Sequence, residues 1–211
     1  MEKIKMIIYD CDGVIFDSAK ANVEYYNYIF KKFGLPVISD KNEEHLKVLH
    51  TYSNDEVFKY FVKEHTLQKE IIAFSKSVDY SIFYKYMQLE QDFFKCCKIL
   101  KKWGLKIGVA TNRSISFKGI VKFFILEDIL DDYVTALDVE RPKPYPDMLN
   151  LILERNSLKP DEAIFIGDSY LDYKCAKSAG VKFVGYKYKI DNELTIEKHL
   201  ELLEILKNFE Y

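Results

Sequence analysis

The stretch that decides the fold is Ile4-Lys5-Met6-Ile7-Ile8-Tyr9, followed at once by Asp10-Cys11-Asp12-Gly13-Val14. A run of strand-favouring residues ends there in two carboxylates one residue apart, and a glycine then lets the backbone turn away. In an open α/β sheet, ligands bind beside the carboxyl ends of the strands. Two acids at such a place repel each other unless a positive charge lies between them, so the pattern indicates a hard cation held by oxygen ligands.

The composition is that of a globular protein with a real core, since 48% of the 211 residues are hydrophobic and 30% are charged. The formal net charge is −2, with both signs interspersed along the chain, which argues against a nucleic-acid-binding or membrane-binding surface. We expect no signal peptide and no membrane span, because no apolar run approaches the ~20 residues that a span needs.

The cysteines carry no sign of a secreted disulfide framework or of zinc spacing. We therefore expect reduced thiols in a cytoplasmic protein, which we take to be a monomer or a weak homodimer. The cysteines are Cys11, Cys96, Cys97 and Cys175.

Helical spacing dominates residues 18–88. An apolar stripe with alternating spacings of four and three begins at Ala19 and ends before Gly34. Short helices are predicted over 42–50 and 79–88, and Ser53-Asn54-Asp55-Glu56 is a capping box that opens another helix. Because nothing here resembles a strand, we predict an all-helical segment.

Strands and helices alternate from Asp92 onwards. The predicted strands are 106–111, 133–137, 163–166 and 181–186. The predicted helices run from Phe93 to Gly104, over 115–126, through Met148 to Leu153, up to Ala179, and along a closing amphipathic stripe of Ile196, Leu200, Leu203 and Leu206.

This alternation predicts the α/β class, with a three-layer, Rossmann-like parallel sheet and helices on both faces. The core is expected to comprise residues 1–17 and 89–211, and residues 18–88 to form an inserted all-helical cap. Asp10, Thr111, the loop 138–143 and Asp168 follow different strands. Because the strands are parallel, we expect these positions to share one edge of the sheet.

Side chains at that edge could support the cleavage of a phosphate ester. Asp10 can attack phosphorus, and Asp12 could protonate the leaving oxygen and later deprotonate water. Asp168 adds a third acid, and an all-oxygen ligand set suits Mg²⁺. The side chains that could balance the charge of the transferring group are those of Thr111, Asn112 and Lys143.

Each of these residues also has a simpler explanation. Asp-x-Asp-Gly occurs in ordinary turns, Thr111-Asn112 could cap a helix, and Lys143 could be a solvated loop lysine. Asp172 lies one helical turn after Asp168 and could favour a helix N-terminus electrostatically. Strand alternation turns Cys11 away from its neighbours, so we expect it to be a packing residue. The arginines that adjoin these motifs reach a substrate or, as we prefer, brace acidic loops: they are Arg113 and Arg141.

Four motifs in this order resemble the haloacid dehalogenase-like hydrolase superfamily, in its phosphoglycolate phosphatase-like and β-phosphoglucomutase-like branch with a helical cap. The motifs are Asp10-Cys11-Asp12-Gly13-Val14-Ile15-Phe16-Asp17-Ser18, Ala110-Thr111-Asn112, Lys143-Pro144-Tyr145-Pro146 and Gly167-Asp168-Ser169-Tyr170-Leu171-Asp172. The resemblance covers essentially the whole chain.

The resemblance implies a Mg²⁺-dependent enzyme in which Asp10 is both nucleophile and metal ligand. Asp12 would be the acid/base and would bind the metal through its backbone carbonyl. Asp168 would be a direct metal ligand, and Asp172 would act through water or as support. The residues that would hold the phosphate are Thr111, Asn112 and Lys143.

Three functions remain open: a phosphatase, a phosphomutase, and a non-catalytic module that binds phosphate and metal. The mutase-like members resemble this chain at the first motif but carry a histidine at the position of Asn22. Asp12 also argues against dehalogenation, which has no leaving group that needs this acid. We therefore expect water to accept the phosphoryl group of a small phosphorylated metabolite, such as phosphoglycolate or a sugar phosphate.

Selectivity for that metabolite is expected to reside in the cap, since the core loops meet only the phosphoryl group. By resemblance, a loop between the first two cap helices faces the active site, and it corresponds to about residues 47–52. The candidate contacts are Lys47, His50 and Tyr52. An exposed loop without contact to substrate is the alternative.

Overall fold

The computed structural model describes residues 3–207, and of His50 and Thr51 it describes the backbone alone. The chain forms two compact units: unit 1, Met1–Phe16 with Leu89–Tyr211, and unit 2, Asp17–Gln88. The boundaries fall within β2 (Phe16–Asp17) and β3 (Gln88–Leu89), which pair with each other in a two-stranded sheet. The sequence did not lead us to predict these two short strands.

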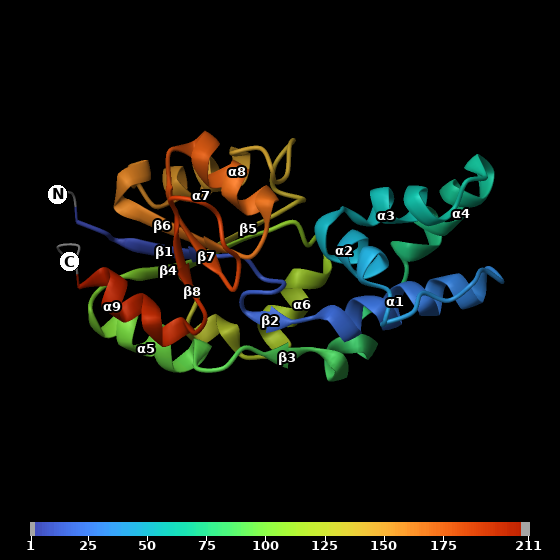
Figure 1. Cartoon of the computed structure of the whole chain (residues 1–211), viewed down its shortest axis with the longest axis horizontal. Coiled ribbons are helices and arrows are strands. Elements are labelled where there is room, and N and C mark those ends of the chain that lie inside the picture. Colours follow the sequence, from blue (N-terminus) through green and yellow to red (C-terminus); the bar gives the residue numbers. More distant parts are fainter. Residues whose placement is uncertain (1–2, 208–211) are drawn as a thin grey trace. The chain divides into compact units, whose positions relative to one another are not determined.

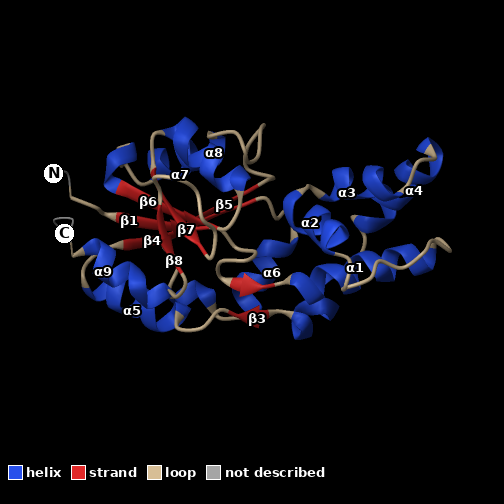
Figure 2. Cartoon of the chain, in the orientation of Figure 1, coloured by secondary structure: helices blue, strands red, loops and turns tan. Residues whose placement is uncertain are grey.

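A six-stranded sheet runs through the centre of unit 1 (Figure 2). From edge to edge its strands are β5 (Asp132–Thr135), β4 (Lys106–Thr111), β1 (Met6–Tyr9), β6 (Ala163–Gly167), β7 (Lys182–Tyr186) and β8 (Leu194–Ile196). Every pairing is parallel. All residues of β1 and β6 are buried, as expected for strands that helices cover on both faces. The predicted α/β fold is confirmed.

Helices cover both faces of this sheet, and Figure 1 shows α7 and α8 on one side with α5 and α9 on the other. The helical segments of unit 1 are α5 (Phe93–Lys102), α6 (Ser116–Phe123), η2 (Leu126–Asp128), α7 (Asp147–Arg155), η3 (Pro160–Glu162), α8 (Tyr170–Ala179), η4 (His199–Glu201) and α9 (Leu202–Leu206). The core on the α7 and α8 side includes Met6, Ile8, Phe165, Met148, Ile152, Cys175 and Ala176. The three layers together hold the strand ends in fixed positions.

Unit 2 is helical, as predicted. Its segments are α1 (Ala19–Lys32), α2 (Glu43–Thr51), α3 (Asn54–Phe61), α4 (His65–Ser75) and η1 (Tyr80–Tyr86). Helix α4 was not predicted, and the segment predicted over 79–88 is a 3₁₀ helix. Aromatic residues of α1 hold the unit together, since Tyr25 packs edge-on against Phe83 and Tyr26 against Phe58. The predicted capping box is present, with the Ser53 backbone N–H donating to Glu56 at 2.9 Å.

The end of unit 1 departs from the prediction. Ile196 belongs to β8, so the single amphipathic helix from Ile196 to Leu206 is wrong. The β-branched pair Thr195-Ile196 continues the sheet beside β7, and only η4 and α9 follow as short helical turns. The buried residues of this segment thus come from three elements, and their spacing in the sequence resembles that of one amphipathic helix.

The four cysteines are buried and form no disulfide. Burial raises the pKa of the Cys11 thiol well above its ordinary value, which is consistent with the packing role expected for it. Between residues 3 and 207, no helix combines the length and the apolar character that crossing a membrane requires.

His199 ties the C-terminal segment to the loop that follows β1, a contact that the sequence did not reveal. Its buried ring lies parallel to Tyr186, with centroids 4.5 Å apart, and Nε2 lies 2.9 Å from the Val14 carbonyl oxygen. Because a carbonyl only accepts, Nε2 must carry the proton, which leaves Nδ1 bare. Nδ1 has no hydrogen-bond partner among the described residues, so protonation would bury an unpaired donor. This burial lowers the pKa of His199 to about 4.

The free energy of unfolding should therefore fall as the pH drops from 6.5 towards 4, where His199 binds a proton in the unfolded chain but not in the folded protein. We expect this residue to contribute about 3 kcal/mol to the loss. His199→Gln should be less stable than the wild type but should flatten this pH dependence in urea denaturation. His65→Gln, at an exposed histidine, is the control and should keep the wild-type slope. Parallel slopes for His199→Gln and the wild type would contradict the assignment.

Candidate active site

The predicted site residues of unit 1 gather at one edge of the sheet. Asp10 follows β1, Thr111 ends β4 and Asp168 follows β6. These strands are neighbours in register, since Tyr9 pairs with both Val109 and Ile166. Because parallel strands end at the same edge, side chains far apart in the sequence come together there.

Lys143 lies at the centre of the site. Its ammonium group lies 2.7 Å from Asp10 Oδ1 and 2.7 Å from Asp172 Oδ1, and its side chain is 3% exposed. Burial opposes the charged form, but the carboxylates of Asp10 and Asp172 outweigh this and raise the pKa of Lys143 above its ordinary range. Lys143 is thus a charged, buried group that joins two acids, and the solvated-loop explanation fails.

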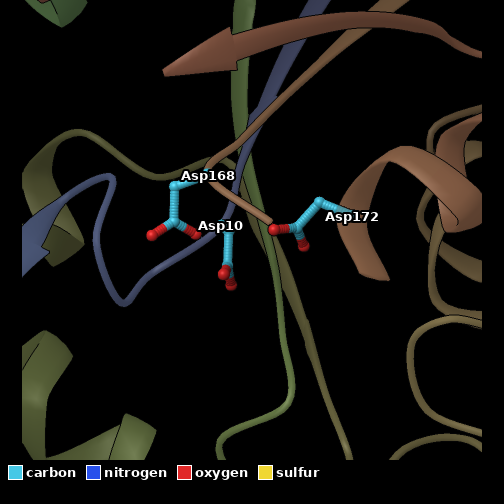
Figure 3. Close-up of side chains that lie close together, drawn as sticks. All are labelled: Asp10, Asp168 and Asp172. Atoms are coloured by element: carbon cyan, nitrogen blue, oxygen red, sulfur yellow. The ribbon is translucent and has the colours of Figure 1, made fainter. Parts of the chain in front are cut away.

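The carboxylates of three aspartates, two of which pair with this lysine, lie close together at this edge (Figure 3). Oxygen atoms of Asp10, Asp168 and Asp172 lie within 4.8 Å of one another. Among the described residues, no hydrogen bond or ion pair joins the Asp168 carboxylate to a partner. Three negative charges against one ammonium leave an excess that a divalent cation would balance, and the all-oxygen donor set suits Mg²⁺.

The acids of this cluster hold their protons more tightly than usual. Burial raises the pKa of Asp10 to about 7, the carboxylates of Asp172 and Asp12 add to the rise, and Lys143 opposes it. Burial likewise raises the pKa of Asp168 well above its ordinary value, with Asp172 and Asp10 adding to it. A cation bound between them would favour the ionised forms, because it removes the repulsion.

Two glycines make the close approach of these acids possible. Gly13 has φ of +72°, and a Cβ atom there would lie 1.8 Å from Asp168 Oδ2. A Cβ atom on Gly167 would lie 2.3 Å from Cβ of Asp172. The glycine of each acidic motif therefore leaves room for an aspartate of the site.

Asp172 lies at the start of a helix and also contacts the site lysine. It is fully buried, and Oδ2 accepts from the Ser169 hydroxyl at 2.5 Å and from the Ser169 backbone N–H at 3.1 Å, in a capping box at the start of α8. Its other oxygen accepts from Lys143 at 2.7 Å. The helix start thus fixes one side of the site.

Asp12 does not join the cluster through its carboxylate. Arg113 Nε donates to Oδ2 at 2.7 Å and Nη2 donates to Oδ1 at 2.5 Å. These contacts agree with the interpretation that we preferred for Arg113, that it braces an acidic loop. Arg141 likewise pairs with Asp147 through two contacts, of 3.1 and 2.9 Å.

Thr111 and Asn112 lie beside these groups. Thr111 is buried, and its hydroxyl oxygen accepts from the Arg113 backbone N–H at 3.1 Å. The side chain of Asn112 bonds the backbone of Lys143 twice, accepting from its N–H at 3.0 Å and donating to its carbonyl at 3.1 Å. Asn112 therefore holds the lysine loop in place, a role that the sequence did not suggest.

The candidates in unit 2 lie on α2 rather than in a loop. Lys47 is an exposed residue of that helix, and Tyr52 is exposed at its C-terminal end. His50 lies in the last turn of α2, and its side chain is outside what the structure describes.

Gly13→Ala should cost more stability than Gly104→Ala. Both glycines have positive φ, but a Cβ atom on Gly104 meets nothing within 4 Å. The shared backbone strain should cost about 1–2 kcal/mol, and the collision with Asp168 should cost Gly13→Ala at least about 1 kcal/mol more. Urea denaturation measures the difference. Equal losses would show that Asp168 does not need the space beside Gly13.

Known proteins share both the sequence pattern and the fold. The model of the haloacid dehalogenase-like hydrolase family matches residues 7–186. The pyrophosphatase PpaX of Bacillus velezensis is 27% identical to this chain over 94% of the chain and 90% of that protein.

Two solved structures are also similar. A HAD-superfamily hydrolase of subfamily IA from Geobacter sulfurreducens is 38% identical, with a TM-score of 0.80 and 96% of each chain covered. A protein described as a predicted phosphoglycolate phosphatase from Haemophilus somnus has a TM-score of 0.80 at 21% identity, covering 97% of this chain and 99% of its own. The second likeness shows the fold alone. With the family model matching most of its length, this chain belongs to the haloacid dehalogenase-like hydrolase family.

Proposed function

We propose that this protein is a Mg²⁺-dependent phosphatase that transfers the phosphoryl group of a small metabolite to water through an aspartyl-phosphate on Asp10. The observation that carries the proposal is the buried Lys143 ammonium between Asp10 and Asp172, with the Asp168 carboxylate beside them. The proposed nucleophile, the proposed phosphate-binding cation and the proposed metal ligands would therefore act together at one strand edge.

In the proposed reaction, each side chain of the site has a separate role in two successive steps. Asp10 attacks phosphorus, the bond to the leaving oxygen breaks, and Asp12 gives its proton to that oxygen. Asp12 then takes a proton from water, whose oxygen attacks the phosphoryl group and releases Asp10. Thr111 and Lys143 would hold the phosphoryl oxygens, and Asn112 would hold the loop that carries Lys143.

The metal would be held by Asp10, Asp168 and the Asp12 backbone carbonyl, with Asp172 as support. When bound, Mg²⁺ would supply positive charge against the phosphoryl oxygens and the carboxylates. Asp172 suits the supporting place because both its oxygens already accept hydrogen bonds.

Pyrophosphate is a substrate to test beside phosphoglycolate and sugar phosphates, because the relative from Bacillus velezensis is named a pyrophosphatase. A mutase is disfavoured at Asn22, which stands where mutase-like members carry a histidine. Asn22 Oδ1 accepts from the Tyr80 hydroxyl at 2.9 Å within unit 2. Water is therefore the proposed acceptor.

Unit 2 is proposed as the cap that selects the substrate, through Lys47, His50 and Tyr52, and that excludes water during turnover. The side chains of Lys47, in the middle of α2, and Tyr52, at its C-terminal end, are exposed polar groups, which leaves them available to a ligand. The core motifs would then be common to all substrates.

Asp10→Asn should lower the hydrolysis of an aryl phosphate at least about a thousandfold, because an amide cannot form the phosphoryl intermediate. Chelation of divalent cations should abolish wild-type turnover, and added Mg²⁺ should restore it. Asp128→Asn, at an exposed aspartate of η2, is the control and should retain wild-type turnover. Unchanged phosphate release by Asp10→Asn would overturn the proposal.

The triple variant Lys47→Ala, His50→Ala and Tyr52→Ala should change the ranking of phosphoglycolate, a sugar phosphate and pyrophosphate by about tenfold or more in kcat/KM. Turnover of an aryl phosphate should stay within about twofold, since the core performs the chemistry. Lys59→Ala, at an exposed lysine of α3, serves as the control. If the triple variant kept the wild-type ranking, substrate selection would lie elsewhere.

A further inference from the structure

The two acids of the first motif are each held by their own cation. Asp10 pairs with Lys143, a point charge, whereas Asp12 pairs with Arg113 through two contacts. A guanidinium that binds both oxygens fixes the plane of the carboxylate as well as its position. The orientation of Asp12 is thus set separately from that of Asp10.

The backbone of Arg113 is itself anchored. Its N–H donates to Thr111 Oγ1 at 3.1 Å, and its carbonyl accepts from the Ala136 N–H at 3.0 Å. These two contacts tie Arg113 to the end of β4 and to the residue that follows β5. The guanidinium is therefore projected from a fixed point of the sheet edge.

Burial distinguishes this pair from the other ion pairs of the chain's arginines. The Arg113 side chain is 8% exposed, against 57% for Arg141 and 42% for Arg155. Exposed pairs contribute little to stability, because water screens them. A partly buried pair with two contacts on the acid/base candidate points to a role in the site.

We propose that Arg113 is a positioning residue that aims the Asp12 carboxyl group at the leaving oxygen. The inference rests on the phosphatase function proposed above. Before phosphoryl transfer, one Asp12 oxygen leaves its contact with Arg113 and takes up a proton from solvent, while the other oxygen keeps its contact. As Asp10 attacks phosphorus and the bond to the leaving oxygen breaks, Asp12 gives this proton to the leaving oxygen. In the second half, the same carboxylate accepts a proton from water as the water oxygen bonds to phosphorus. The bond between phosphorus and Asp10 breaks, inorganic phosphate leaves, and Asp10 is again a carboxylate.

A positioning role predicts an effect that depends on the leaving group. An alkoxide leaves poorly without a proton, whereas 2,4-dinitrophenolate leaves readily without one. If the Asp12 carboxyl group loses its orientation, hydrolysis of the alkyl ester should slow selectively. General damage to the fold would slow hydrolysis of both esters alike. The parameter to compare is kcat/KM, which reports the steps up to the transfer onto Asp10.

We expect Arg113→Met to lower kcat/KM for an alkyl phosphate about a hundredfold and for 2,4-dinitrophenyl phosphate less than about tenfold. Asp12→Asn should show the same selectivity, and adding Arg113→Met to Asp12→Asn should cause little further loss, because the two residues act as a unit. Arg155→Met is the control and should leave both substrates at wild-type rates. Arg113→Lys keeps the positive charge but cannot contact both Asp12 oxygens as a guanidinium does, so kcat/KM should fall less, with the same selectivity. This variant provides the test if Arg113→Met does not fold.

Equal losses on both esters in the Arg113 variants, or additive losses in the double variant, would overturn this inference while leaving the phosphatase intact. A wild-type protein that hydrolyses neither ester with Mg²⁺ would overturn the proposed function itself, and this inference with it.

Discussion

The ammonium group of Lys143, buried between the carboxylates of Asp10 and Asp172, is the interaction on which the site depends. It joins three segments: the end of β1, the loop before α7 and the first turn of α8. A buried charge without its partner costs roughly 3–5 kcal/mol, so these segments have to stay together. One ammonium group does not balance the negative charges of three carboxylates. That excess of negative charge is the physical reason for expecting a divalent cation.

Two constraints on space act together with this charge balance. Gly13 and Gly167 leave no atom where Asp168 and Asp172 approach the backbone. Asn112 fixes the backbone of Lys143 from the neighbouring strand end, so the lysine is held at both its main chain and its ammonium group. The second cation, Arg113, donates to both carboxylate oxygens of Asp12, whereas the carboxylate of Asp10 faces those of Asp168 and Asp172.

The sequence predicted what local pattern determines. The apolar run before Asp10 predicted a buried central strand, and the alternation after Asp92 predicted a parallel sheet. Because parallel strands end at one edge, the sequence also predicted that Asp10, Thr111 and Asp168 lie together. It failed where a pattern has two readings, as at Ile196, where strand and helix-like turns together imitate a helical stripe. It also missed contacts between distant residues, such as His199 with Val14 and Asn112 with Lys143, because no spacing in the chain records them. For Asp172 the structure has the helix-start position that the sequence predicted, together with a contact to Lys143, and its role towards a metal stays a prediction.

Whether Asp10 carries the phosphoryl group during turnover is measured most directly by rapid acid quench of the protein with Mg²⁺ and an aryl phosphate, followed by peptide mass spectrometry. We expect a phosphoryl group on the peptide that contains Asp10, formed before steady-state release of phosphate and absent from Asp10→Asn. A phosphoryl group on another residue, which persists in Asp10→Asn while turnover continues, would contradict this expectation.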